Sequence, residues 1–174
     1  MVRFYFLLLL FVSCTSTRNE QNRLRINLNN FSIKPNDCNF KSKTIDTVSF
    51  YKLILNNKII QHRKNRYISL EKIEGLKFYS KGKVGYFNDV NLLDFESLNP
   101  KNAIMGVYNC DEKTVNVEYI SKSPQKGIYL WKENIFSISK KRDTITAFSE
   151  TSLDTIQYVK VPLENFFLNY KPDW

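Results

Sequence analysis

The fold is decided by the stretch TVNVEYI, residues 114–120. In it, Val115, Val117 and Tyr119 alternate with the polar Asn116 and Glu118. Successive side chains of an extended chain point to opposite faces, so this pattern is typical of a strand with one buried and one wet face. We therefore expect Val115, Val117 and Tyr119 to line the interior of the protein, and Asn116 and Glu118 to face solvent.

Similar runs, each bounded by turn residues, recur along most of the chain. Glycine is scarce, at 5 residues, but asparagine is frequent and tolerates left-handed turn conformations nearly as well. The short connections predict antiparallel neighbours. The further predicted strands are residues 24–28, 48–55, 58–62, 67–70, 76–80, 83–87, 104–108, 127–131, 135–139, 144–148 and 154–161. The predicted tight turns are residues 56–57, 80–82, 109–113, 133–134 and 140–143.

Little helix is expected beside these strands. Residues 90–98 have an ambiguous apolar spacing that allows a helical turn or two. Pro162 followed by Leu163 and Glu164 is typical of a helix start, which predicts a short C-terminal helical turn over residues 163–168.

A meander of about eight to ten strands exposes two edges, and closure into a barrel removes both. The predicted fold class is therefore all-β, an antiparallel up-and-down barrel with a short C-terminal helical turn. About half of the strand aromatics should point inward. They would either fill the barrel as a packed core or surround a small apolar cavity open at one mouth.

The N-terminus carries a different signal. Arg3 precedes a short apolar run, Phe4 to Val12, then Ser13 and Cys14. This run is too short to span a bilayer, which needs about 20 helical residues. A positive start, a short apolar run and a small residue are typical of a secretory signal. If this is an ordinary secretory peptide, Cys14 follows it by chance; the other hypothesis gives the cysteine a role in processing.

Residues 11–14, FVSC, resemble the lipobox of bacterial lipoproteins. The resemblance implies a signal peptide over residues 1–13 and a lipidated Cys14 that begins the mature protein. The residue after the cysteine, Thr15, is not Asp, which in that family favours transfer to the outer membrane. Residues 14–23 are then the lipidated cysteine and a flexible tether, and residues 24–174 a single β-barrel domain. Over residues 40–161 the strand rhythm is similar to that of lipocalin-like small lipoproteins, which implies an envelope protein whose barrel binds a ligand.

Charge and cysteines limit the partners. The formal net charge of +9 raises the question of a nucleic-acid partner, but an exported protein meets little DNA or RNA, so no nucleic-acid partner is expected. The basic runs at residues 62–66 and 140–142 are either solvated loop tips or contacts for acidic lipid headgroups and anionic glycans. Cys38 and Cys110 either form a disulfide, as export allows, or stay separate buried thiols. Two cysteines and one histidine, His62, lack the spacing of a zinc site.

No catalytic constellation emerges from the sequence. A nucleophile elbow and a phosphate-binding glycine loop are both missing, and His62 lies within a basic run. We therefore expect a protein that is not an enzyme and needs no cofactor. It would bind a small apolar ligand or support envelope assembly. The alternative is a protein- or glycan-interaction module that acts through its basic loops, and an enzyme is the least favoured hypothesis.

Overall fold

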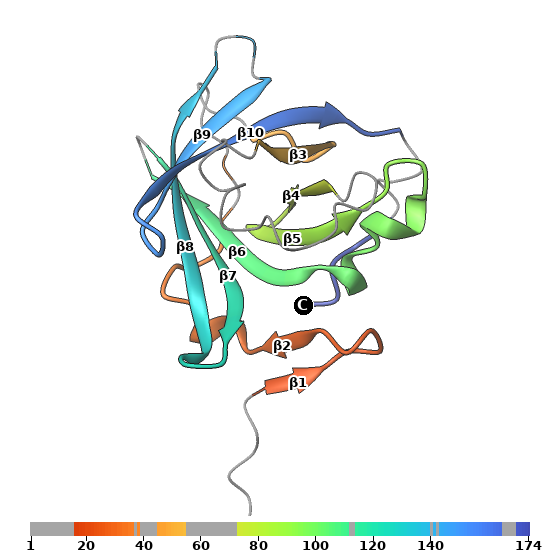
Figure 1. Ribbon diagram of the computed structural model, residues 1–174, viewed down its shortest axis with the longest axis vertical. Coiled ribbons are helices and arrows are strands. Elements are labelled where there is room, and N and C mark those ends of the chain that lie inside the picture. The colour runs from red at the N-terminus through yellow and green to blue at the C-terminus, as the bar shows by residue number, and fades with distance from the viewer. Residues whose placement is uncertain are drawn as a thin grey trace, which may run out of the picture.

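A closed antiparallel barrel of eight strands forms the body of the protein in the computed structural model (Figure 1). Each strand pairs with its neighbours in the chain, and β10 closes the barrel against β3. The predicted all-β, up-and-down barrel is therefore confirmed. The structure describes residues 16–36, 38, 45–54, 73–111, 114–139, 141, 143–164 and 170–174. The barrel strands are β3 (Ser49–Ile54), β4 (Ile73–Tyr79), β5 (Lys83–Val90), β6 (Ile104–Cys110), β7 (Val115–Ser123), β8 (Gly127–Ile138), β9 (Thr144–Ser149) and β10 (Asp154–Pro162).

The alternation in β7 has the expected effect on one of its faces. Val115, Val117 and Tyr119 are all buried and belong to the largest hydrophobic cluster. In the same cluster Tyr51, Phe78 and Tyr108 pack edge to face, with ring centroids 5.4 and 5.1 Å apart. One part of the barrel interior is thus filled by aromatic side chains.

The longest strand, β8, departs from the sequence-based expectation. A turn was predicted at Glu133 and Asn134, but both residues lie inside β8, so that prediction is wrong. Glu133 is opposite Val117 on one side and Ser149 on the other, so its backbone is held between two neighbouring strands. A register shift between Ile135 and Ser137 interrupts the pairing with β9 instead.

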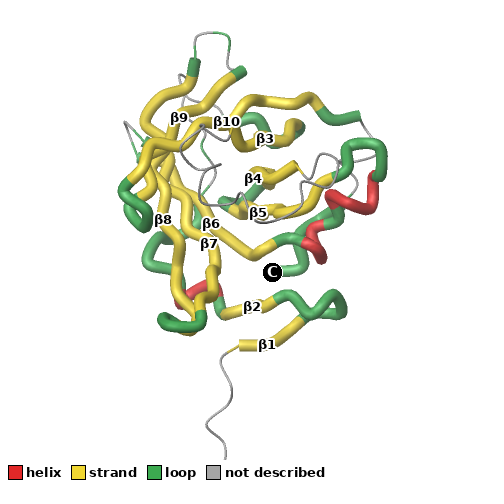
Figure 2. Tube along the Cα trace, in the orientation of Figure 1, coloured by secondary structure: helices red, strands yellow, loops and turns green. Residues whose placement is uncertain are grey.

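An N-terminal hairpin packs outside the barrel (Figures 1 and 2). Its strands are β1 (Ser16–Arg18), which lies where the sequence had indicated a flexible tether, and β2 (Leu24–Ile26), which lies in the strand predicted over residues 24–28. The 3-10 turn η2 (Leu28–Asn30) follows it. Leu24, Ile26 and Leu28 then pack against a cluster on the outer face of β6 and β7, whose buried members are Phe31, Met105, Val107 and Ile120. Burial of this apolar face explains why the segment is ordered.

This outer layer also changes the environment of Glu118. The side chain was expected in solvent, but the residue is only 2% exposed, so that expectation is wrong. The backbone N–H of Ser32 donates to its carboxylate at 2.8 Å, the Ser32 hydroxyl donates as well, and Lys132 forms an ion pair at 3.2 Å. Asn116 is half-buried and donates to Asn109 at 3.0 Å.

A second outer layer covers β3 and β5. Two 3-10 turns, η3 (Phe95–Leu98) and η4 (Pro100–Asn102), connect β5 to β6. Of the two, η3 lies in the segment 90–98, for which a helical turn or two was allowed, and η4 follows that segment. Their Leu98 joins Phe50, Phe87, Val90 and Ala103 in a buried cluster. Within the described part of the chain, no helix has the length and apolar composition needed to cross a membrane. The predicted strands at 58–62 and 67–70 and most of the C-terminal helical turn lie outside the described residues.

Candidate functional site

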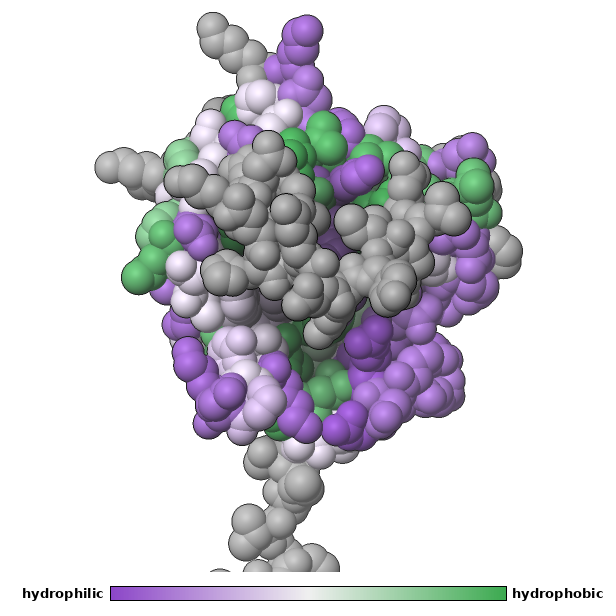
Figure 3. Space-filling view, in the orientation of Figure 1, coloured by the Kyte–Doolittle hydropathy of each residue, from purple (hydrophilic) through white to green (hydrophobic). Residues whose placement is uncertain are grey.

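The barrel interior contains a cavity of about 940 Å³. It occupies the part of the interior that the aromatic cluster of Tyr51, Phe78 and Tyr108 does not fill, and it reaches the β1–β2 hairpin. In Figure 3, hydrophobic surface shows in a recess in the lower half of the molecule, bordered by hydrophilic surface. The volume lies within the range of about 300 to 1,000 Å³ that is common for small-molecule sites. The residues that line the cavity are Arg18, Asn22, Arg23, Leu24, Leu53, Tyr86, Asn88, Ile104, Tyr119, Ile120, Ser121, Lys122, Ile128, Trp131, Glu133, Ser152, Asp154, Ile156 and Tyr158.

Three aromatic rings form a continuous wall of this cavity. Tyr86 of β5 stacks on Tyr119 of β7 with centroids 4.8 Å apart and planes 4° apart. Tyr119 in turn stacks on Trp131 of β8 at 6.2 Å. Tyr119 and Trp131 face each other because they are directly opposite in the register of the two strands. The wall offers flat, polarisable surface to a ligand.

Among the described residues that line the cavity, Glu133 carries the one buried carboxylate. It is 1% exposed. Its Oε1 accepts hydrogen bonds from the Tyr119 hydroxyl at 2.8 Å and the Trp131 indole at 3.1 Å, and its Oε2 accepts one from the Tyr158 hydroxyl at 2.8 Å. Burial raises the pKa of Glu133, and the three donors oppose this effect without cancelling it. The same burial, together with the charge of Glu133, raises the pKa of both tyrosines.

A second carboxylate lies close to the same aromatic wall. The hydroxyl of Tyr86 donates to Glu74 Oε2 at 3.0 Å. Because Tyr86 stacks on Tyr119, the two acid–tyrosine pairs stand side by side, one from β4 and β5 and the other from β7 and β8. Polar groups thus meet the apolar walls at a few defined points, as in ligand-binding cavities.

Basic side chains border the cavity where it meets the hairpin. Arg18 and Arg23 come from the β1–β2 hairpin, and Lys122 comes from the end of β7. Arg18 is exposed and donates to Asn22. The acidic Asp154, at the start of β10, lines the same region. Among these four charged side chains the three cations outnumber the one anion, so this border of the cavity is mainly basic.

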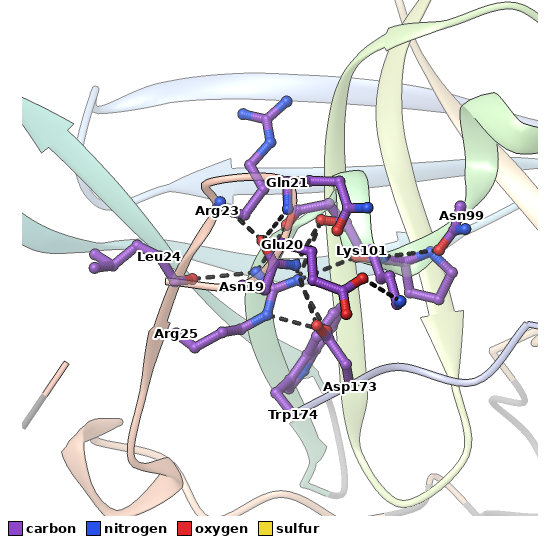
Figure 4. Close-up of polar contacts among 12 residues, drawn as sticks. Asn19, Glu20, Gln21, Arg23, Leu24, Arg25, Asn99, Lys101, Asp173 and Trp174 are labelled. Carbon is purple, nitrogen blue, oxygen red and sulfur yellow. Dashed lines mark hydrogen bonds and ion pairs between the residues drawn. The ribbon is translucent and has the colours of Figure 1, made fainter. Parts of the chain in front are cut away.

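The hairpin is held in place by the C-terminus (Figure 4). Arg25 is buried and donates to Asp173 Oδ1 through Nε at 3.0 Å and Nη2 at 2.8 Å. Asn19 also donates to Asp173, at 3.1 Å. Burial acts to raise the pKa of Asp173, but the hydrogen bonds from Asn19 and Arg25 outweigh it and lower the pKa. The Arg25 guanidinium lies 4.8 Å above the ring of Trp174.

The predicted site residues fall into different places. Tyr119 lines the cavity, whereas Val115 and Val117 lie in the filled part of the interior. Cys38 and Cys110 form a disulfide with Cα atoms 5.4 Å apart. Cys14 and His62 lie outside the described residues. In the described ranges, no cluster of three or more His, Cys, Asp or Glu side chains could hold a metal ion.

The sequence interpretation missed Glu133 because it assigned this residue to a turn. A signal was nevertheless present. Trp131, Glu133 and Ile135 continue a period of two, which places all three on one face of an uninterrupted strand. Comparisons with protein-family models, curated proteins and solved structures found no match.

Proposed function

We propose that this protein is a bacterial envelope lipoprotein, attached to the outer membrane through a lipidated Cys14, whose barrel binds a small, largely apolar ligand without turning it over. The observation that carries the ligand-binding part is the cavity of about 940 Å³ with its wall of stacked aromatic rings. A barrel that served only as a scaffold would be more stable with this space filled. Side chains that line an empty space lack contact partners on one side and so lose dispersion attraction.

The lipid-anchor part rests on the residues around Cys14. It predicts that labelled palmitate is incorporated into the wild-type protein and lost in Cys14→Ser. Two or three acyl chains would hold the protein at the membrane almost permanently, since each buried methylene contributes about 0.8 kcal/mol. Recovery of unlabelled wild-type protein from the soluble fraction would contradict the anchor.

Ligand binding is tested with an environment-sensitive apolar fluorophore and the folded protein. Ser121 lines the cavity near the end of β7, so Ser121→Trp should fill part of the cavity and weaken binding about tenfold. Gln125 is exposed in the β7–β8 turn and does not line the cavity, so Gln125→Trp is the matched control and should bind normally.

Saturable binding that is equally strong in both variants would place the dye outside the barrel. Absence of saturable binding in the wild type would remove the small-ligand function. The basic border of the cavity, with Arg23 and Lys122, would then favour the alternative of a protein- or glycan-interaction module.

A further inference from the structure

The barrel interior contains a buried carboxylate, that of Glu133, which has no cationic partner among the described residues. Its partners are the hydroxyls of Tyr119 and Tyr158 and the indole of Trp131, and no lysine or arginine of the described ranges pairs with it. A buried carboxylate without a positive partner is costly, so such a group either keeps a proton or meets a cation. No cationic side chain among the described residues is paired with this carboxylate, whereas the adjoining cavity is large enough to admit a cation.

The geometry leaves room for one more donor at this carboxylate. An ionised carboxylate has about four acceptor positions. The three protein donors occupy two at Oε1 and one at Oε2. Glu133 also lines the cavity with the small part of its surface that is exposed, so a ligand that enters can contact it there. A charged nitrogen could take the position that remains.

The surroundings of Glu133 also favour a positive group. The titratable groups that face it are Tyr119 of β7, Tyr158 of β10 and, one ring further, Tyr86 of β5 with Glu74 of β4. Beside it on β8 is the uncharged Trp131, and opposite on β9 is Ser149. All of these are neutral or acidic. Aromatic faces attract cations, and more strongly when water is excluded.

The basic side chains at the border of the cavity would instead attract an anionic ligand. Of the three cations of this border, Arg18 and Lys122 are exposed and Arg23 is half-buried, so water and salt screen their fields more than the field of a fully buried charge. Glu133 is buried, where the same charge acts through a lower effective dielectric constant. The deep carboxylate therefore outweighs the border in the choice of ligand.

We propose that the ligand of this barrel carries a protonated amine on its apolar body and that this amine binds Glu133 within the aromatic wall. The inference rests on the proposed ligand-binding function. Because the pKa of Glu133 is raised, the empty barrel holds a proton there at low pH, and the amine must displace it. Affinity for an amine should therefore increase as the pH rises through the pKa of Glu133.

The test compares three probes with the same ten-carbon chain: decylamine, decanol and decanoate. Each is titrated into the wild-type protein, and displacement of the apolar fluorophore is measured. We expect the amine to bind about tenfold or more tightly than the alcohol near neutral pH, the advantage typical of a buried charge-assisted hydrogen bond. Glu133→Gln should bind the amine and the alcohol equally. Glu150→Gln, which removes an exposed carboxylate, should keep the preference.

Equal binding of all three probes by the wild type, or tightest binding of decanoate, would overturn the amine proposal and leave the ligand-binding function intact. Failure of every probe to displace the fluorophore would overturn both. The selectivity of the wild type decides the matter even if Glu133→Gln does not fold. A preference for the amine that is lost on acidification supports the role of Glu133 directly.

Discussion

A buried guanidinium, that of Arg25, connects the hairpin that borders the cavity to the barrel and the C-terminal residues, and Arg25→Met tests how much it contributes to stability. Methionine retains much of the apolar length of arginine but provides no donor. Arg25 is 7% exposed and donates to Asp173, to the carbonyl of Ala103 at 3.1 Å and to that of Pro100 at 3.2 Å. The substitution removes all of these bonds at once.

The expected cost follows from what the substitution leaves behind. Removing one partner of a buried ion pair costs about 3 to 5 kcal/mol, because the other charge stays unpaired. The Asp173 side chain is 27% exposed. Water and the remaining bond from Asn19 compensate part of the loss. We therefore expect the free energy of unfolding to fall by about 2 to 3 kcal/mol.

Urea unfolding followed by tryptophan fluorescence measures this change, since Trp174 stacks on Arg25 and reports its environment. Arg18→Met is the control. Arg18 is exposed and donates hydrogen bonds to Asn22, four residues away in the same hairpin, so we expect a loss below about 0.5 kcal/mol. If the two variants lost equally little stability, the Arg25–Asp173 contact would not be what holds the hairpin.

Three further predictions concern the barrel itself. Under denaturing, non-reducing conditions, Cys38 and Cys110 should resist alkylation, and an intact mass that shows two modified thiols would contradict their bond. Gly75→Ala should cost about 3 kcal/mol or more in thermal unfolding, because a Cβ there would overlap the backbone of β3, whereas Gly127→Ala, with a φ of 67° and open space, should cost only about 1 to 2 kcal/mol. Although burial acts to raise the pKa of Glu118, its hydrogen bonds and ion pair lower it, so its stabilisation is present above the unfolded-state pKa and lost as the pH falls through the folded-state pKa. The stability advantage of the wild type over Glu118→Gln should therefore shrink on acidification, and a constant difference would contradict the assignment.

Alternation in the sequence determined the class of fold. Val115, Val117 and Tyr119 could be assigned to one strand face without knowledge of their neighbours, because the period of two is a local property of extended chain. Short connections between such runs then required antiparallel pairing, and the need to remove exposed edges led to a barrel.

Only the tertiary structure decided what each face meets. Glu118 has the same local pattern as a solvent-facing residue, but the segment around Ser32 covers it, and that contact joins positions 86 residues apart. The tether expected over residues 14–23 instead contributes β1 to a hairpin, because it pairs with β2, whose apolar side chains are buried against β6 and β7. Long-range contacts of this kind leave no local period to read.

For the candidate site, too, the sequence predicted the place of one residue and only the tertiary structure decided the place of another. Tyr119 was placed inside by its own alternation, whereas Glu133 was assigned to a turn because glutamate followed by asparagine is poor in strand propensity. Its place inside the barrel is decided by the register with β7 and β9, which hold the backbone extended and turn the carboxylate toward Tyr119 and Tyr158. Strand propensity depends on a few neighbouring residues, whereas register is a property of the closed sheet. For Glu133 and Asn134, pairing with the neighbouring strands outweighed their low strand propensity.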